Sequence, residues 1–139
     1  MIAVIMIIAI IIGIALPRFS GIQQEALQTK ARGELRTIQT ALESYYINRT
    51  PNAYPATSST LINDVLLSVS PQITSQVLYD PFQSSGSDEY NYVRSDNGRY
   101  YVIFSVGMDG VSDITGIDDA GMLEGTQDDD IFASNGGGW

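Results

Sequence analysis

Acidic side chains gather in one stretch of the chain, residues 107–130, where glycines separate them. Hard dications such as calcium take roughly six to eight oxygen ligands from carboxylates and backbone carbonyls, and a glycine-rich loop presents both kinds. The spacing differs from that of the EF-hand loop. The residues alone therefore leave two interpretations open, a calcium loop and a solvated acidic loop. The acids concerned are Asp109, Asp113, Asp118, Asp119, Glu124, Asp128, Asp129 and Asp130.

Catalytic arrangements are not evident elsewhere in the sequence. The chain has no His and no Cys, so it lacks the usual general base, the usual transition-metal ligand and any disulfide or thiolate site. Paired carboxylates can hydrolyse glycosides, but these acids lie in a glycine-rich stretch with no aromatic-lined cleft evident beside it. Neither a Gly-x-Ser-x-Gly elbow nor a phosphate-binding glycine loop is present. We therefore expect a protein that is not an enzyme.

Charge is distributed unevenly along the 139 residues, whose net charge is −9. Five of the seven basic residues precede residue 50, and the acids dominate from Asp80 onward. An acidic C-terminal half repels nucleic acid and anionic lipid. We expect no nucleic-acid partner.

The chain begins with an apolar run, residues 1–16, that carries no charge. As a helix the run spans about 24 Å, whereas a membrane-crossing helix usually has roughly 20 residues and spans about 30 Å. No basic segment precedes it and no small-residue cleavage site follows it, so we expect an anchor helix over residues 1–17, with further residues upstream, rather than a signal peptide. A buried core helix is the alternative interpretation. Gly13 and Pro17 predict a bend or a melted turn between this anchor and the next segment.

Residues 18–50 predict an amphipathic helix that continues the anchor. It is expected to end at Thr50-Pro51, because the residue before a proline is pushed out of the helical region. A second, short helix is expected from Leu61 to Val69. The apolar positions of the long helix are Phe19, Ile22, Ala26, Ala31, Leu35, Ile38, Leu42 and Tyr45.

The remaining residues, 51–139, predict a globular part with a small antiparallel sheet. Tyr90–Val93 and Tyr100–Val106 are rich in aromatic and β-branched residues, and Ser95–Gly98 between them has the composition of a hairpin turn. In the second strand we expect Tyr100, Val102, Phe104 and Val106 to face the long helix. A third strand is expected at Ile131–Ala133.

These segments resemble a known family. The apolar segment, the proline after it and the long amphipathic continuation are similar to a type IV pilin. The C-terminal half resembles the major pseudopilin of type II secretion systems. Its most specific motifs are SxGxDG at 105–110 and DDI at 129–131. The matching pieces, which cover nearly the whole chain, are Tyr54-Pro55, Asp80-Pro81-Phe82, Tyr90-Asn91-Tyr92, Tyr101–Val111, Gly125–Ile131 and Trp139.

The resemblance implies an α+β, pilin-like fold, in which a long N-terminal helix, apolar in its first half and amphipathic in its second, packs on a small antiparallel sheet. Family members begin with a phenylalanine released by a prepilin peptidase and carry a glutamate four residues later. Counting back from Pro17 places that glutamate just before Met1. The resemblance therefore implies about five more residues upstream, which restores a run long enough to span a bilayer.

The resemblance also implies a calcium site in the acidic loop. The chain departs from the family pattern at Ser112–Glu124, an acidic insertion that offers further ligands in Asp113, Asp118 or Asp119, or else a second site. The ligands carried over from the family are the carbonyls of Val106, Val111 and Gln127 and the carboxylates of Asp109, Asp129 and Asp130.

The function that the resemblance implies is structural. We expect a subunit of a helical filament that is held in the inner membrane, extracted by assembly machinery, and packed against copies of itself to give an extracellular or periplasmic fibre. A surface pilus and a secretion pseudopilus both remain open. A single-pass, membrane-anchored domain that binds or senses calcium without polymerising is the alternative. The residues expected to mediate assembly are Met1, Ile5, Ile8, Ile12, Gly13 and Pro17.

Overall fold

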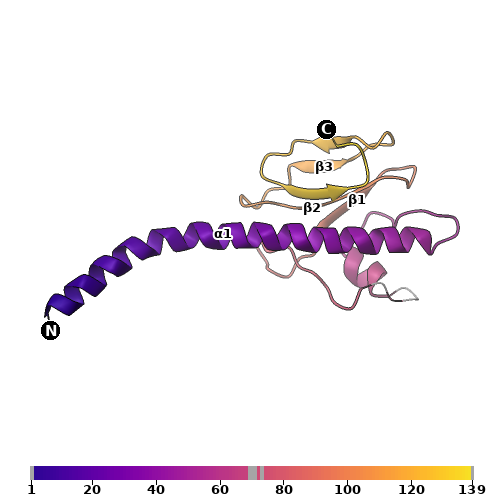
Figure 1. The fold of residues 1–139 in the computed structure, drawn as a ribbon. Helices are drawn as coiled ribbons and strands as arrows, with labels where there is room; N and C mark the ends of the chain where they lie inside the picture. Colours follow the sequence, from indigo (N-terminus) through magenta and orange to yellow (C-terminus); the bar gives the residue numbers. More distant parts are fainter. Residues whose placement is uncertain (1, 69–71, 73, 139) are drawn as a thin grey trace.

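A long helix lies along a small β-rich body in the computed structural model of the protein (Figure 1). The structure describes residues 2–68, 72 and 74–138, and at 14–20 and 63 it describes the backbone alone. The expected α+β class, with a long N-terminal helix and a small antiparallel sheet, is confirmed. The elements are α1 (Ile2–Ile47), η1 (Ile62–Leu66), β1 (Asn91–Arg94), β2 (Tyr101–Ser105), β3 (Ile114–Ile117), β4 (Leu123–Gly125) and β5 (Ile131–Ser134).

Helix α1 runs without interruption through Pro17. A proline inside a helix removes one hydrogen bond and bends the helix more readily than it ends it. The sequence predicted either a bend or a melted turn here, and the melted turn is wrong. The N-terminal part of the helix does curve away from the line of the rest (Figure 1). Within the described residues, no helix has the combination of length and apolarity that crossing a membrane requires.

The second half of α1 packs on the sheet. Leu35, Ile38 and Leu42 are fully buried, in one cluster with Tyr101 and Ile103 of β2. Burial on this face begins at Ala31. Of the stripe members whose side chains the structure describes, Ile22, which is 62% exposed, and Ala26 lie outside the core, because α1 extends beyond the sheet there.

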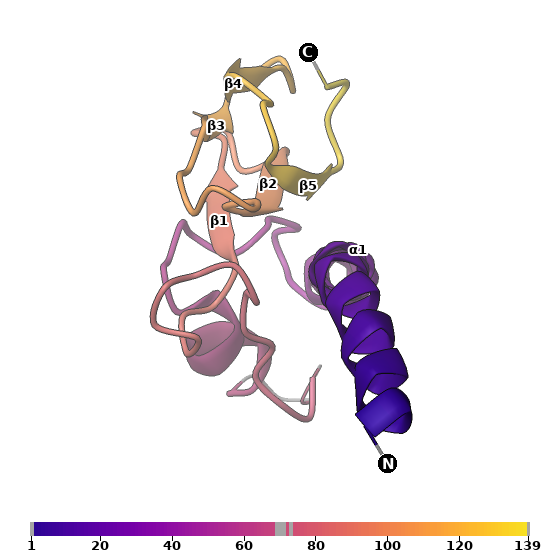
Figure 2. The same cartoon turned by 90° about the vertical axis from the view of Figure 1, so that its left-hand side faces the viewer.

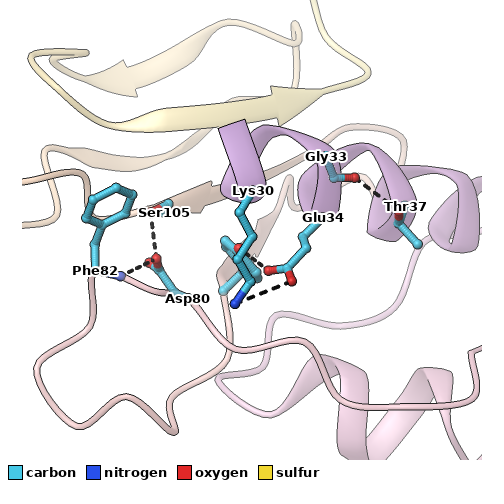
Figure 3. Close-up of polar contacts among 8 residues, drawn as sticks. Lys30, Gly33, Glu34, Thr37, Asp80, Phe82 and Ser105 are labelled. Carbon is cyan, nitrogen blue, oxygen red and sulfur yellow. Dashed lines mark hydrogen bonds and ion pairs between the residues drawn. The ribbon is translucent and has the colours of Figure 1, made fainter. Parts of the chain in front are cut away.

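Carboxylates of α1 also accept hydrogen bonds from tyrosines of the globular part. Glu43 accepts the hydroxyl of Tyr101 at 3.1 Å and that of Tyr54 at 2.9 Å. Glu34 accepts the Tyr90 hydroxyl at 2.6 Å. The Glu34 carboxylate also lies 3.7 Å from the ammonium of Lys30 (Figure 3). Burial and then these carboxylates raise the tyrosine pKa values well above their ordinary value of 10.0.

Strand β2 is the centre of the sheet β1-β2-β5, and its neighbours both run antiparallel to it. Figure 2 shows α1 on one side of this sheet and the pair β3-β4 beyond the other. Tyr101 and Ile103 pack with α1, whereas Val102 and Phe104 pack with Ile114 of β3. The expectation that Val102 and Phe104 face the helix is therefore wrong. Both faces of β2 are apolar, and the second sheet covers the face that was assigned to α1.

The inserted segment is a β-hairpin rather than a loop. Ile114, Ile117 and Leu123 are buried against the second face of β2. Asp118 stabilises the turn, because its Oδ1 accepts hydrogen bonds from the amides of Ala120 and Met122 at 2.9 and 2.8 Å. The expectation of a continuous acidic loop over residues 107–130 is thus corrected: strands occupy 114–117 and 123–125.

The other sequence predictions concern ends of elements. Helix α1 ends at Ile47, close to the predicted boundary, and the turn before β2 has Gly98 at a φ of +72°. The short second helix is the π-helical η1, without a side-chain cap of its own; Glu89 accepts the hydrogen bond of the Ile62 amide at 2.6 Å. Its expected end at Val69 lies outside the described residues, as do Met1 and Trp139.

Candidate metal centre

A buried carboxylate fixes the point at which the acidic segment, residues 107–130, follows β2. Asp80 is fully buried, and its Oδ1 accepts hydrogen bonds from the Ser105 hydroxyl at 2.7 Å and the Phe82 amide at 3.0 Å (Figure 3). Its Oδ2 accepts the amide of Val106 at 3.0 Å. Because three donors converge on one side chain, the backbone at Val106 is held where the segment begins.

The two halves of the acidic segment meet at Gly107. This glycine has a φ of +67°, and a Cβ on it would lie 2.6 Å from Cγ of Asp129. The close approach lets Oδ2 of Asp129 accept hydrogen bonds from the amides of Met108 at 2.5 Å and Asp109 at 3.1 Å. Glycine is therefore required here for both its conformation and its missing side chain.

Asp130 faces the opposite way, toward the start of β3. It is 4% exposed, and its Oδ2 accepts hydrogen bonds from the amides of Asp113 at 2.9 Å and Ile114 at 2.8 Å. The amide of Asp130 donates to the carbonyl of Gln127 at 2.9 Å, which closes a turn before β5. The adjacent aspartates thus bind two different parts of the chain: Asp129 binds the backbone just after β2, and Asp130 binds the backbone at the start of β3.

Oxygen atoms of these side chains remain without a hydrogen-bond donor. Among the described residues, Oδ1 of Asp129, Oδ1 of Asp130 and Oδ2 of Asp113 are buried and unpartnered. Carboxylate oxygens of the same three residues all lie within 4.8 Å of one another. A second group with the same closeness consists of Asp109, Asp113 and Asp128. A buried carboxylate oxygen without a partner is unfavourable unless a cation or donor satisfies it.

The electrostatics of the group are repulsive. Loss of hydration and then the charges of Asp109, Asp128 and Asp129 raise the pKa of Asp113. Burial raises the pKa of Asp130, while the amides of Ile114 and Asp113 oppose that shift. Carboxylates that repel one another at this range favour either protonation or a bound cation.

The structure brings together only part of the predicted ligand set. Asp129 and Asp130 share one group, and Asp109 lies in the neighbouring one. Val106 is buried, whereas Val111 and Gln127 are exposed. Of the three aspartates of the insertion, Asp113 belongs to both groups. Asp118 and Asp119 belong to neither.

Asp128 was not among the predicted ligands. It is one of three consecutive aspartates, and nothing in the sequence distinguishes it from the other two. The donors in both groups are all oxygen atoms, which suits a hard dication such as calcium rather than a soft or redox metal. The orphaned buried oxygens of Asp129 and Asp130 fit such an ion.

Comparison with known proteins identifies a family. The family model described as type II secretion system (T2SS), protein G, matches residues 18–121, more than half of the chain. No curated protein and no solved structure gives a significant match. The matched range takes in β1, β2 and β3 and ends before Asp128–Asp130.

Proposed function

The chain belongs to the family of type II secretion system protein G, the pseudopilins, and from this premise we propose that it is a structural subunit of a secretion pseudopilus. Proteins of this family are structural rather than catalytic. The family favours a secretion pseudopilus over a surface pilus, and a polymerising subunit over an anchored domain that acts alone. The subunit would associate with the membrane before assembly, and the secretion machinery would then add it to a periplasmic fibre.

The exposed apolar surface of α1 carries this proposal. The first twelve described residues, Ile2–Gly13, are exposed throughout, and Ile5, Ile8 and Ile12 each expose half or more of their surface. Burying an exposed isoleucine side chain is worth about 1.5–3 kcal/mol, so several of them together favour association by many kcal/mol. This segment of α1 contributes nothing to the described core of its own subunit.

We propose that the partner surface is the same segment of neighbouring copies. A helix that is apolar on all sides is buried by equivalent helices when it leaves lipid. Gly13 suits such packing: among the described residues no atom lies within 4 Å of where its Cβ would be, so packing within the subunit does not require a glycine. Met1 and Pro17 were also expected to mediate assembly, but the structure describes neither side chain.

Filament assembly can be tested with one substitution made at two positions. Ile8→Lys places a charge on the exposed apolar segment, and Ile47→Lys places the same charge on an isoleucine that is 73% exposed at the other end of α1. In cells that carry the secretion machinery, electron microscopy should show fibres for the wild type and for Ile47→Lys. It should show none for Ile8→Lys. Wild-type fibre numbers in Ile8→Lys, or no fibres from any chain, would contradict the proposal.

We also propose that the acidic centre binds calcium. Asp129 and Asp130 would hold the ion through their unpartnered Oδ1 atoms, with Asp109 and the carbonyls of Val106, Val111 and Gln127 as further ligands implied by the family. The bound ion supplies positive charge that offsets the repulsion between the carboxylates. A ligand present at about 100 times its dissociation constant stabilises the folded state by about 2.7 kcal/mol.

The calcium proposal is tested by thermal unfolding of the full chain, with a mild detergent added to cover the apolar part of α1. Calcium should raise the melting temperature of the wild type relative to a chelator, and the double variant Asp129→Asn with Asp130→Asn should lose that difference. Equal wild-type melting temperatures with calcium and with chelator would refute calcium binding.

A further inference from the structure

Asp113 belongs to both clusters of aspartates, the one with Asp129 and Asp130 and the one with Asp109 and Asp128. One of its carboxylate oxygens lies within 4.8 Å of oxygens of Asp129 and Asp130, and one lies equally close to oxygens of Asp109 and Asp128. It comes from the insertion, so the family resemblance assigns it no role. Its Oδ2 is buried and, among the described residues, has no hydrogen-bond donor. Asp130, a member of the same group, is more than nine-tenths buried, and its Oδ1 is likewise buried without a hydrogen-bond donor among the described residues.

Contacts on both sides fix the backbone of Asp113. Its amide donates to Oδ2 of Asp130, and its carbonyl accepts the amide of Thr126 at 3.1 Å. Gly125 has a φ of +101°, and a Cβ on it would lie 2.2 Å from the Asp113 carbonyl. Strand β3 begins at the next residue. The backbone that carries the Asp113 side chain is therefore fixed where the hairpin meets the segment before β5.

The other two aspartates of the insertion make hydrogen bonds elsewhere. Asp118 accepts hydrogen bonds in the β3-β4 turn. Asp119 accepts the amide of Asn97 at 2.8 Å through Oδ1, and its carbonyl accepts the Asn97 side-chain amide at 3.0 Å. These contacts join the hairpin to the turn before β2. Of the three aspartates of the insertion, Asp113 is the one that lies in a group of carboxylates able to hold a cation.

We propose that Asp113 is a third carboxylate ligand, which binds one calcium ion together with Asp129 and Asp130 and couples the β3-β4 hairpin to the ion. This proposal rests on the calcium binding proposed above. Calcium affinity rises with the number of charged ligands and with the rigidity of the site, and Asp113 contributes to both. An ion held by Asp113 and Asp130 connects the insertion to β5, which pairs with β2.

Isothermal titration of the full chain with calcium chloride, in the same detergent, tests the assignment. Asp113→Asn keeps the shape of the side chain and both backbone hydrogen bonds but removes the charge. Asp119→Asn is the matched control, because it removes the same charge from an exposed position of the same insertion outside both groups. We expect Asp113→Asn to weaken calcium binding by about tenfold or more and Asp119→Asn by less than about threefold.

Hydrogen exchange supplies a second measurement. Calcium should slow amide exchange in residues 114–117 of the wild type and of Asp119→Asn, but not of Asp113→Asn. If Asp113→Asn binds and protects like the wild type while Asp129→Asn loses calcium, the assignment of Asp113 is overturned and the calcium proposal survives. If the wild type itself binds no calcium, both proposals fail.

Discussion

The substitution Asp80→Asn tests whether the carboxylate below the acidic segment is a structural anchor. Asp80 is fully buried, and its two oxygens serve donors from different parts of the chain. Oδ1 accepts the amide of Phe82 and the hydroxyl of Ser105, and Oδ2 accepts the amide of Val106. A serine hydroxyl can reverse its role and donate elsewhere. The two backbone amides can only donate.

Asparagine has one acceptor oxygen at this position. Whichever way the new side chain turns, the amide of Phe82 or of Val106 faces an NH₂ group. A buried donor without a partner costs about 1–3 kcal/mol, and exchanging charge-assisted bonds for neutral ones adds about 1 kcal/mol. The expected loss is therefore about 2–4 kcal/mol. For a domain of this size that corresponds to a fall in melting temperature of about 8–16 °C.

The assay is thermal unfolding followed by circular dichroism, with chelator present so that no metal contributes. Asp88→Asn, an exposed position close by in the sequence, is the control and should lie within about 2 °C of the wild type. A melting temperature for Asp80→Asn equal to or above that of the wild type would refute the reasoning. It would mean that relief of a buried charge outweighs the lost acceptor.

Further predictions concern the acidic segment, the core and the tyrosines. Gly107→Ala should lower the calcium-dependent gain in melting temperature, because the new Cβ displaces Asp129. Gly86→Ala is the control: the φ of Gly86 is similar, +63°, but no atom lies within 4 Å of its Cβ position. It should therefore show only the backbone strain of about 1–2 kcal/mol. Urea unfolding should show a loss of about 2–5 kcal/mol for Leu35→Ala but under about 1 kcal/mol for Leu27→Ala, which is partly exposed. Equal losses would place the core elsewhere. The free energy of unfolding should fall as the pH rises past about 10, because the unfolded state then releases tyrosine protons that the folded state retains. Urea titrations at pH 8, 10 and 11 measure this, and an unchanged midpoint would contradict the burial of the tyrosines whose pKa values are raised, Tyr54, Tyr90, Tyr92 and Tyr101.

The elements that were predicted correctly have local causes. The helix follows from the spacing of Leu35, Ile38 and Leu42, which lie on one stripe whatever covers them. Strand β2 follows from a run of β-branched and aromatic residues after a turn that needs Gly98. Each of these signals is contained within a few neighbouring residues, so no tertiary information is needed to read it.

The face of β2 that meets the helix was predicted wrongly because both faces are apolar. Alternation separates Val102 and Phe104 from Tyr101 and Ile103 but does not say which pair meets α1. The answer depends on β3-β4, which covers one face. The hairpin was itself missed, because Ile114 and Leu123 stand among aspartates and glycines that favour loops.

The candidate site shows the same limit. Asp129 and Asp130 were identified as a pair, yet the structure gives them opposite directions, one toward Met108 and the other toward Ile114. Within the insertion, sequence could not separate Asp113 from Asp119. Which acid points toward the group depends on the register of the hairpin, and that register is set by burial against β2 rather than by the acids.

The position of the acidic segment on α1 connects the two proposed roles. The side-chain amide of Gln28 donates to the sulfur of Met108 at 3.1 Å, close to the point where burial of α1 under the sheet begins at Ala31. The segment therefore touches the helix near the boundary between its packed half and its exposed half. Met108 remains partly exposed at this contact. Under the proposed function, a neighbouring subunit that packs along the exposed half of α1 meets this segment next, so an ion that orders the segment also shapes the edge of the subunit contact.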